Sequence, residues 1–317
     1  MGDWEIAINL MPIRSLDILD LPLIARYRND ALTLDSTRAL TRGHPLSAAG
    51  MLAYVNPARH LYSAVANGNG NTLLGGVIHS HNETFAKLLY LAPASRLDHA
   101  ALPGLVEHLV TQVGGWGAFH VIAEIDETSD AFPALRQAGF SVYAWQRMWD
   151  VSELSSTTDK TKIWARARSM NRPALQSLYH QIVPQLMQPV EPLSKNTRGL
   201  ICDGDVKCYV SMSSGAQGIV LTPLIHPEAT GVETKLTSLL NCIPDRRGRP
   251  VYLCVRSYQA WLEPALEDLG AKSAPRQAVM VKHLARLIKD EQTVPAVPSG
   301  VSVQPSRVSR LQIKNHD

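Results

Sequence analysis

The second half of this chain repeats the pattern of the first at a constant offset of 131 residues. The match runs without a gap through three pairs of residues: Pro133 and Pro264, Gly139 and Gly270, Gln146 and Gln277. Upstream, Leu91-Ala92-Pro93 corresponds to Leu221-Thr222-Pro223 at an offset of 130, and a one-residue change in a loop explains the slip. Because self-similarity at a fixed period is typical of duplicated structural units, the chain is predicted to hold two copies of one fold.

Each copy is predicted to end in a strand, a short helix and a second strand. The apolar runs at 120–126 and 251–257 are typical of strands buried on both faces. The segment that follows starts at a Pro, which suits the first turn of a helix. It ends at a Gly, which as a C′ residue can adopt a positive φ. The last strands are expected at 141–151 and 277–284.

Upstream elements complete the pattern of each copy. An amphipathic helix is predicted at 101–113, with Pro103 in its first turn. In the second copy, Thr230 and Glu233 have the spacing of a capping box that opens a helix. Two Asn-Gly steps in 67–71 predict a hairpin. With a strand and a helix at the start, each copy reads β-α-β-β-β-α-β-α-β, which indicates a mixed α/β fold with a mostly antiparallel sheet flanked by helices.

These patterns divide the chain into four segments. The predicted linker is rich in Ser and Thr, and the predicted tail is interrupted by Pro and poor in large apolar residues, which is typical of disorder. The segments are an N-terminal domain at 1–151, a linker at 152–161, a C-terminal domain at 162–288 and a disordered tail at 289–317.

Composition and charge limit the kinds of molecule that the chain is expected to bind and where it is expected to be found. The 31 basic and 28 acidic residues leave a formal net charge of +3, which does not favour a nucleic acid as partner. No apolar run approaches the roughly 20 residues of a membrane helix, and the N-terminus lacks the pattern of a secretory signal. The four cysteines form no C-x-x-C pair and no zinc spacing, so we expect a cytoplasmic protein without a metal site.

Each half resembles the GNAT (Gcn5-related N-acetyltransferase) fold, and the resemblance covers residues 1 to about 288. It rests on the element order, on the strand ending in x-Pro before the third helix, and on the element Pro-Ala-Leu-x-x-x-Gly, which occurs twice, at Pro133 and at Pro264. The whole looks like a tandem member of that family. The resemblance implies acetyl-CoA as co-substrate, with the backbone of Leu91, Leu221 and Thr222 beside its pantetheine arm.

In that family, N–H groups of a turn before the third helix hold the pyrophosphate of acetyl-CoA, since a helix N-terminus attracts anions. The family pattern is [Q/R]-x-x-G-x-[G/A]. In the first copy the turn retains Arg96 and Ala101 but has His99 in place of the middle Gly. In the second copy it retains the final Gly, and the corresponding candidates are His226, Ala229 and Gly231. Either turn is a candidate, and so is a turn that binds nothing.

The resemblance also points to missing and candidate catalytic groups. Leu135 and Leu266 stand where the family often has a Tyr that protonates the departing thiolate. A base is also needed to take a proton from the attacking amine. Glu124 is the candidate, because burial in the apolar strand 121–125 would raise its pKa. The alternative is a carboxylate at the strand end, solvated or paired with an Arg.

Two functions therefore stay open. The first is an N-acyltransferase that moves an acetyl group from acetyl-CoA to the amine of a small-molecule or peptide acceptor by direct attack. The second is a catalytically degenerate GNAT pair that serves as a binding or scaffold protein. The missing Tyr and the altered glycines favour the second, and the retention of both copies and of Glu124 favours the first.

Overall fold

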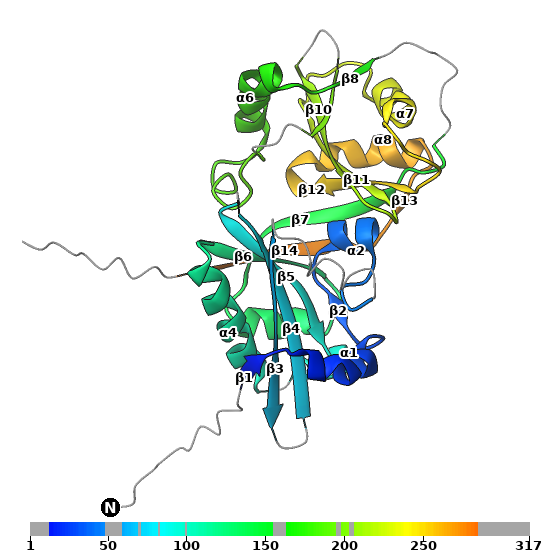
Figure 1. Ribbon diagram of the computed structural model, residues 1–317. Coiled ribbons are helices and arrows are strands. Elements are labelled where there is room, and N and C mark those ends of the chain that lie inside the picture. Colours follow the sequence, from blue (N-terminus) through cyan, green and yellow to red (C-terminus); the bar gives the residue numbers. More distant parts are fainter. Residues whose placement is uncertain are drawn as a thin grey trace, which may run out of the picture. The chain divides into compact units, whose positions relative to one another are not determined.

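The computed structural model describes residues 13–47, 59–68, 71–81, 83–98, 100–154, 163–194, 198–202 and 206–284. In this part of the chain, all strands join one mixed sheet with helices on both faces (Figure 1). The strands are β1 (Ile13–Ser15), β2 (Leu32–Thr33), β3 (Arg59–Gly68), β4 (Asn71–Ser80), β5 (Phe85–Ala92), β6 (His120–Asp126), β7 (Ser141–Asp150), β8 (Trp164–Arg166), β9 (Gly199–Cys202), β10 (Cys208–Ser214), β11 (Ile219–Ile225), β12 (Val251–Arg256), β13 (Lys272–Ser273) and β14 (Gln277–His283). The helices are α1 (Leu21–Tyr27), α2 (Ser36–Arg42), α4 (Leu102–Gly115), α5 (Ala131–Gln137), α6 (Arg172–Ile182), α7 (Val232–Cys242) and α8 (Glu263–Asp268), with short 3-10 turns η1 (Ile18–Asp20), η3 (Ala94–Arg96), η4 (Ser169–Asn171) and η5 (Ser257–Leu262).

Two parallel pairs mark the two copies, and all other pairings are antiparallel, as predicted. Strand β5 pairs with β6 only from Phe85 to Lys87, although both strands continue. Strand β11 pairs with β12 only from Ile219 to Leu221. Beyond these residues the strands separate, and we call the two places of separation the N-terminal fork and the C-terminal fork.

The two copies exchange their last strands. Strand β14, from the second copy, lies between β6 and β7 of the first. Strand β7, from the first copy, pairs with β12 of the second through residues 146–150. Gln146 and Gln277, which the repeat makes equivalent, lie opposite each other in this arrangement. Because equivalent residues of the two copies face each other here, a local two-fold rotation relates the copies at this point. We call β1–β6 with β14 the N-terminal lobe, and β8–β13 with the second half of β7 the C-terminal lobe.

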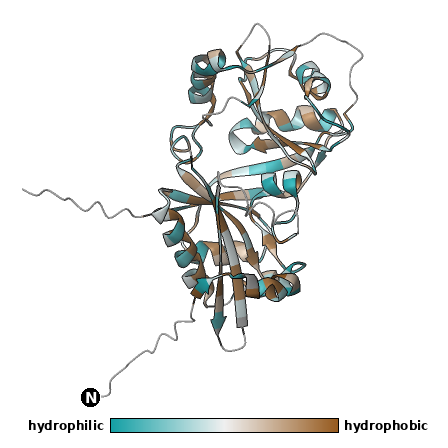
Figure 2. Cartoon of the chain, in the orientation of Figure 1, coloured by the Kyte–Doolittle hydropathy of each residue, from teal (hydrophilic) through white to brown (hydrophobic). Residues whose placement is uncertain are grey.

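Apolar residues recur along the strands (Figure 2), and the buried ones pack against helices on both sides of the sheet. In the N-terminal lobe, α4 and α5 pack on one face and α1 on the other. In the C-terminal lobe, α7 and α8 cover one face and α6 the other. Each lobe therefore has a core on each face of its sheet.

Most predicted elements are confirmed, with three differences: β2 and α2 have no counterpart in the predicted order, Pro223 lies inside β11 rather than at its end, and α7 starts differently. Gly139 and Gly270 follow α5 and α8 with φ of 90° and 82°, as predicted for C′ residues, and Pro103 lies in the first turn of α4. The capping box at α7 is wrong, because Gly231 is the N-cap residue, with φ of 62° and no side-chain hydrogen bond. The tail at 289–317 and most of the predicted linker lie outside the described residues.

Separating the two halves of the chain within residues 155–161 tests the strand exchange. The first half alone would lack β14 and expose long edges of β6 and β7, which promote aggregation. We expect neither half to show a cooperative thermal transition by circular dichroism, and the co-expressed halves to form a one-to-one complex that does. A monomeric, cooperatively unfolding half would contradict the exchange.

Candidate functional site

A row of buried polar side chains crosses the sheet where the lobes meet. Lys87 of β5 lies 3.6 Å from the carboxylate of Glu124 on β6. Gln146 of β7 hydrogen bonds Glu124, and its amide oxygen also accepts from Arg256 of β12. Arg256 in turn pairs with Glu191, which lies between α6 and β9. The row alternates in charge along its length, so its members stabilise one another, with Glu124 and Gln146 buried and Lys87, Arg256 and Glu191 partly exposed.

Glu124 occupies the middle of this row, with a side chain 3% exposed. Its carboxylate accepts the N–H of Ser36 at 2.9 Å. Burial alone would raise the pKa of Glu124, but Lys87, Arg256 and the Ser36 N–H outweigh burial and lower it. The predicted rise in the pKa of Glu124 is therefore wrong. A base with a lowered pKa removes protons poorly at neutral pH, and the catalytic role of Glu124 stays a prediction.

Lys87 joins Glu124 to the start of α2. Its ammonium lies 3.0 Å from Asp35, the N-cap residue of α2, whose carboxylate also accepts the N–H of Arg38. Burial would lower the pKa of Lys87, but Asp35 and Glu124 raise it above its usual value. The lysine thus holds two carboxylates from different elements, and it fixes the segment before α2 against β5 and β6.

That segment fills the N-terminal fork. Strand β2 pairs with β5, so that Leu32 lies opposite Leu91. The N–H of Leu34 donates to the carbonyl of Leu89 at 2.9 Å, and the carbonyl of Leu34 accepts the N–H of Glu124 at 2.9 Å. Leu34 therefore bridges the two separated strands with its own main chain, and its side chain is 1% exposed. While Leu34 is in place, the N-terminal fork has no room for a second extended chain.

The C-terminal fork is bridged differently. Leu221 still pairs with Leu253, so the fork begins at Thr222. Near its open end, the side-chain amide of Gln259 accepts the N–H of Ile225 at 2.9 Å and donates to its carbonyl at 3.0 Å. Within the described residues, no main-chain segment links β11 to β12 past Leu221. A side chain, which can change rotamer, thus spans the C-terminal fork, whereas the main chain of Leu34 spans the N-terminal fork.

The two turns before the third helices also differ. In the N-terminal lobe, the carboxylate of Asp30 accepts the N–H and the hydroxyl of Ser95 at 3.2 and 2.7 Å. Arg96 ends η3 and is exposed, and Ala101 is the N-cap residue of α4. His99 lies outside the described residues. A carboxylate already bound in the turn opposes a second anion there.

In the C-terminal lobe the turn is shorter and its end is open. The N–H of Ala229 donates to the carbonyl of His226 at 2.9 Å. Gly231 is exposed, and a Cβ built on it would meet no atom within 4 Å. The first intrahelical bond of α7 runs from Lys235 to Gly231, which leaves the preceding N–H groups of the first turn without intrahelical partners. These N–H groups and the helix dipole can hold an anion.

Sequence reasoning identified Glu124 but missed its partners. Lys87 and Arg256 each interrupt an apolar strand, as Glu124 does, and the same signal could have singled them out. Their distance from Glu124 in the sequence concealed the pairing. No feature of the sequence indicates the role of Leu34, because its main-chain atoms, and not its side chain, bridge the two strands.

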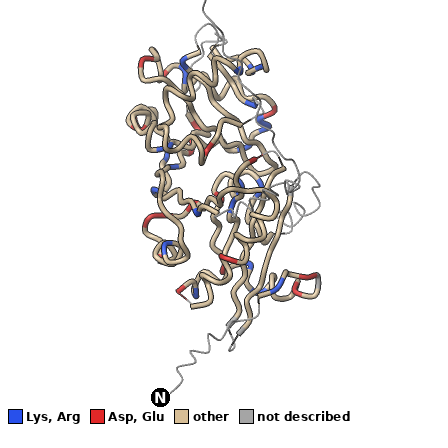
Figure 3. Tube along the Cα trace, turned by 90° about the vertical axis from the view of Figure 1, so that its left-hand side faces the viewer, with Lys and Arg blue, Asp and Glu red and all other residues tan. Residues whose placement is uncertain are grey.

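The described residues contain no group of three His, Cys, Asp or Glu residues that could hold a metal ion. Among them we also find no helix with the length and apolar character needed to cross a membrane. Basic and acidic residues are interspersed along both lobes (Figure 3).

Comparisons with known proteins support the fold. No family model matches the chain, and no curated protein is a significant match. A protein assigned as an acetyltransferase from Pyrococcus horikoshii superposes with a TM-score of 0.51 at 8% identity, over 90% of this chain and 93% of that one. A GCN5-related N-acetyltransferase from Sphaerobacter thermophilus gives 0.50 at 14% identity, over 86% and 95%. A tandem GNAT protein from the clavulanic acid biosynthesis pathway gives 0.47 at 14% identity, over 87% and 99%. The first two establish the fold.

Replacing Lys87 by Met tests the buried row. The variant would leave Asp35 and Glu124 buried without their cation, and we expect it to lower the free energy of unfolding by about 3–5 kcal/mol. Lys272→Met is the control, because its pair with Glu153 is exposed and worth less than about 1 kcal/mol. Equal losses in both variants, measured by urea unfolding, would show that the row does not stabilise the fold.

Proposed function

We propose that this chain, which has the fold of GNAT acetyltransferases, transfers an acetyl group from acetyl-CoA to an amine, and that its C-terminal lobe alone holds acetyl-CoA. One contrast carries the proposal. The N-terminal fork is bridged by the main chain at Leu34, whereas the C-terminal fork is bridged by the side chain of Gln259. The acceptor is the amine of a small molecule or a peptide.

The chemistry of the C-terminal fork suits a pantetheine arm. Pantetheine contains secondary amides, and Ile225 already pairs through both its N–H and its carbonyl with the amide of Gln259. A ligand amide can replace the amide of Gln259 as a partner of Ile225 if the side chain changes rotamer, at the cost of the two hydrogen bonds that Gln259 then gives up. Replacing Leu34 in the other lobe would instead break main-chain bonds to two strands and unpair β2.

The start of α7 suits the pyrophosphate. Its first-turn N–H groups are exposed next to Gly231, whose lack of a side chain lets a ligand approach the backbone. The acidic Glu228 in this turn lies 3.7 Å from Lys207, which offsets part of its charge. In the N-terminal lobe, Asp30 occupies the turn and Pro103 removes an N–H from the first turn of α4.

Acetyl transfer forms a C–N bond and breaks the C–S bond of the thioester. One group must accept a proton from the amine, and another must protonate the thiolate. Tyr258 lies in η5, directly after β12, and packs against a cluster of buried residues that includes Leu224 of β11. Burial, and then the charge of Glu191, raise the pKa of Tyr258, which keeps its phenol protonated but makes it a weaker acid, so its position rather than its acidity favours it as a proton donor. We assign it the role of proton donor to the thiolate.

One observation favours the alternative, a degenerate GNAT pair that binds without catalysis. Pro223 lies inside β11, two residues before Ile225. Because main-chain groups two residues apart in a strand point the same way, Pro223 removes a donor that would otherwise face the fork. A lobe with fewer donors holds its ligand less firmly, so binding and turnover need separate tests.

Calorimetric titration with acetyl-CoA tests which lobe binds. We expect one site per chain. Thr230 and Ala100 each precede the N-cap residue of a third helix, and both are exposed. Thr230→Asp places a negative charge beside the proposed pyrophosphate site and is expected to weaken binding about tenfold or more, about 1.4 kcal/mol, whereas Ala100→Asp leaves binding unchanged. The reverse pattern would assign the site to the N-terminal lobe, and absence of binding would favour the degenerate alternative.

Turnover with a panel of primary amines tests catalysis. Tyr258→Phe is expected to lower kcat roughly 10²–10⁴-fold with acetyl-CoA affinity nearly unchanged. Glu124→Gln is expected to keep kcat within about threefold, since its partners hold it in the N-terminal lobe. A large loss of kcat in Glu124→Gln with unchanged affinity and stability would instead support the base role predicted from the sequence.

A further inference from the structure

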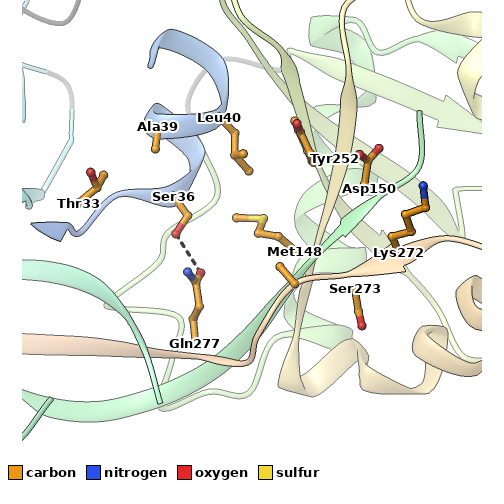
Figure 4. A pocket seen from close by; sticks show the side chains of 11 residues that line it. Thr33, Ser36, Ala39, Leu40, Met148, Asp150, Tyr252, Lys272, Ser273 and Gln277 are labelled. Atoms are coloured by element: carbon orange, nitrogen blue, oxygen red, sulfur yellow. Dashed lines mark hydrogen bonds between the residues drawn. The ribbon is translucent and has the colours of Figure 1, made fainter. Parts of the chain in front are cut away.

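A pocket of about 410 Å³ lies outside both forks, between α2 and the strands β7, β12 and β13 (Figure 4). Its walls come from both copies. Ser36 and Leu40 of α2 lie on one side, and Asp150 and Tyr252 on the other. The volume suits a small organic molecule rather than a single water or ion. None of the residues predicted as site residues lines it, so the pocket is separate from the proposed acetyl-CoA site.

The pocket carries one uncompensated charge. Asp150 and Lys272 are the charged residues among the described ones that line it, and they lie opposite each other on β7 and β13. Lys272 directs its ammonium to Glu153, at 3.5 Å, and its side chain is 78% exposed. Asp150 forms no ion pair within the described residues and accepts the N–H of Ser152 at 2.9 Å. Asp150, Glu153 and Lys272 together therefore leave a net negative charge beside the pocket.

The remaining walls are apolar or hold neutral donors. Met148 and Leu40 pack together beside Tyr252. Burial, together with Asp150, raises the pKa of Tyr252, so its phenol is a neutral donor at pH 7. The hydroxyl of Ser36 is already bound to Gln277 at 2.9 Å (Figure 4). A carboxylate at one end of a mostly apolar wall is complementary to a cationic head on an apolar body.

We propose that this pocket is a binding site for a small organic cation: a protonated amine attached to an apolar or aromatic group, with Asp150 as its counter-ion. The ligand would contact α2 of one copy and β7 and β12 beside it. The site does not depend on the acetyl transfer proposed above, and its occupancy can be measured without acetyl-CoA.

Titration calorimetry with three probes of similar shape tests this site: 2-phenylethylamine, 2-phenylethanol and 3-phenylpropanoate. We expect the amine to bind at least about tenfold more tightly than the alcohol, and the carboxylate to bind least. Asp150→Asn retains the acceptor for Ser152 but loses the charge, and we expect it to reduce amine binding to the level of the alcohol. Glu267→Gln removes the same charge from an exposed residue of α8 outside the pocket and serves as the matched control.

Three results would overturn the proposal: no binding of the amine up to about 10 mM, equal binding of amine and alcohol, or unchanged amine binding in Asp150→Asn. An equal loss in Glu267→Gln would show a general charge effect and would also overturn it. Thermal unfolding of each variant without ligand identifies a folding defect. If Asp150→Asn is destabilised, Tyr252→Phe with the wild-type Asp150 provides the second test, with a preference for the amine over the alcohol expected to persist.

Discussion

The structure depends on the antiparallel pairing of β7 with β14, which begins where Gln146 lies opposite Gln277. Each copy has a penultimate strand, β6 or β12, whose neighbour comes from the other copy. The sheet of either lobe is therefore complete only when both copies are folded. This joins the lobes through main-chain hydrogen bonds as well as side-chain packing, and it places the buried polar row at their junction.

The polar row shows how two copies of one fold became different. Lys87 and Glu124 belong to the N-terminal lobe, and Arg256 belongs to the C-terminal lobe. Buried charges are costly unless each is paired and hydrogen bonded, and here every member has such partners. By holding Asp35 and Ser36, the row also keeps the preceding Leu34 in the N-terminal fork. The same interactions that stabilise the junction thus close one of the two forks.

The candidate residues illustrate which inferences a sequence supports. The burial of Glu124 follows from the apolar residues beside it, and the structure confirms it. The direction of its pKa shift does not follow from its neighbours in sequence, because Ser36, Lys87 and Arg256 are supplied by other elements. Gly231 is likewise a helix N-cap residue in the structure, but its left-handed conformation replaces the capping box expected from Thr230 and Glu233.

The amino-acid sequence by itself determined the duplication, the mixed sheet and the order of all strands and helices except β2 and α2, because these depend on periodicity and on turn residues close together in the chain. Only the tertiary structure decided that the copies exchange their last strands. Both copies end in a similar apolar strand, so pairing within a copy and pairing across copies satisfy the same pattern. The tertiary structure also decided that the N-terminal fork is closed. Main-chain groups of Leu34 close it, and since these groups are the same in every residue but proline, no side chain in the sequence indicates their role.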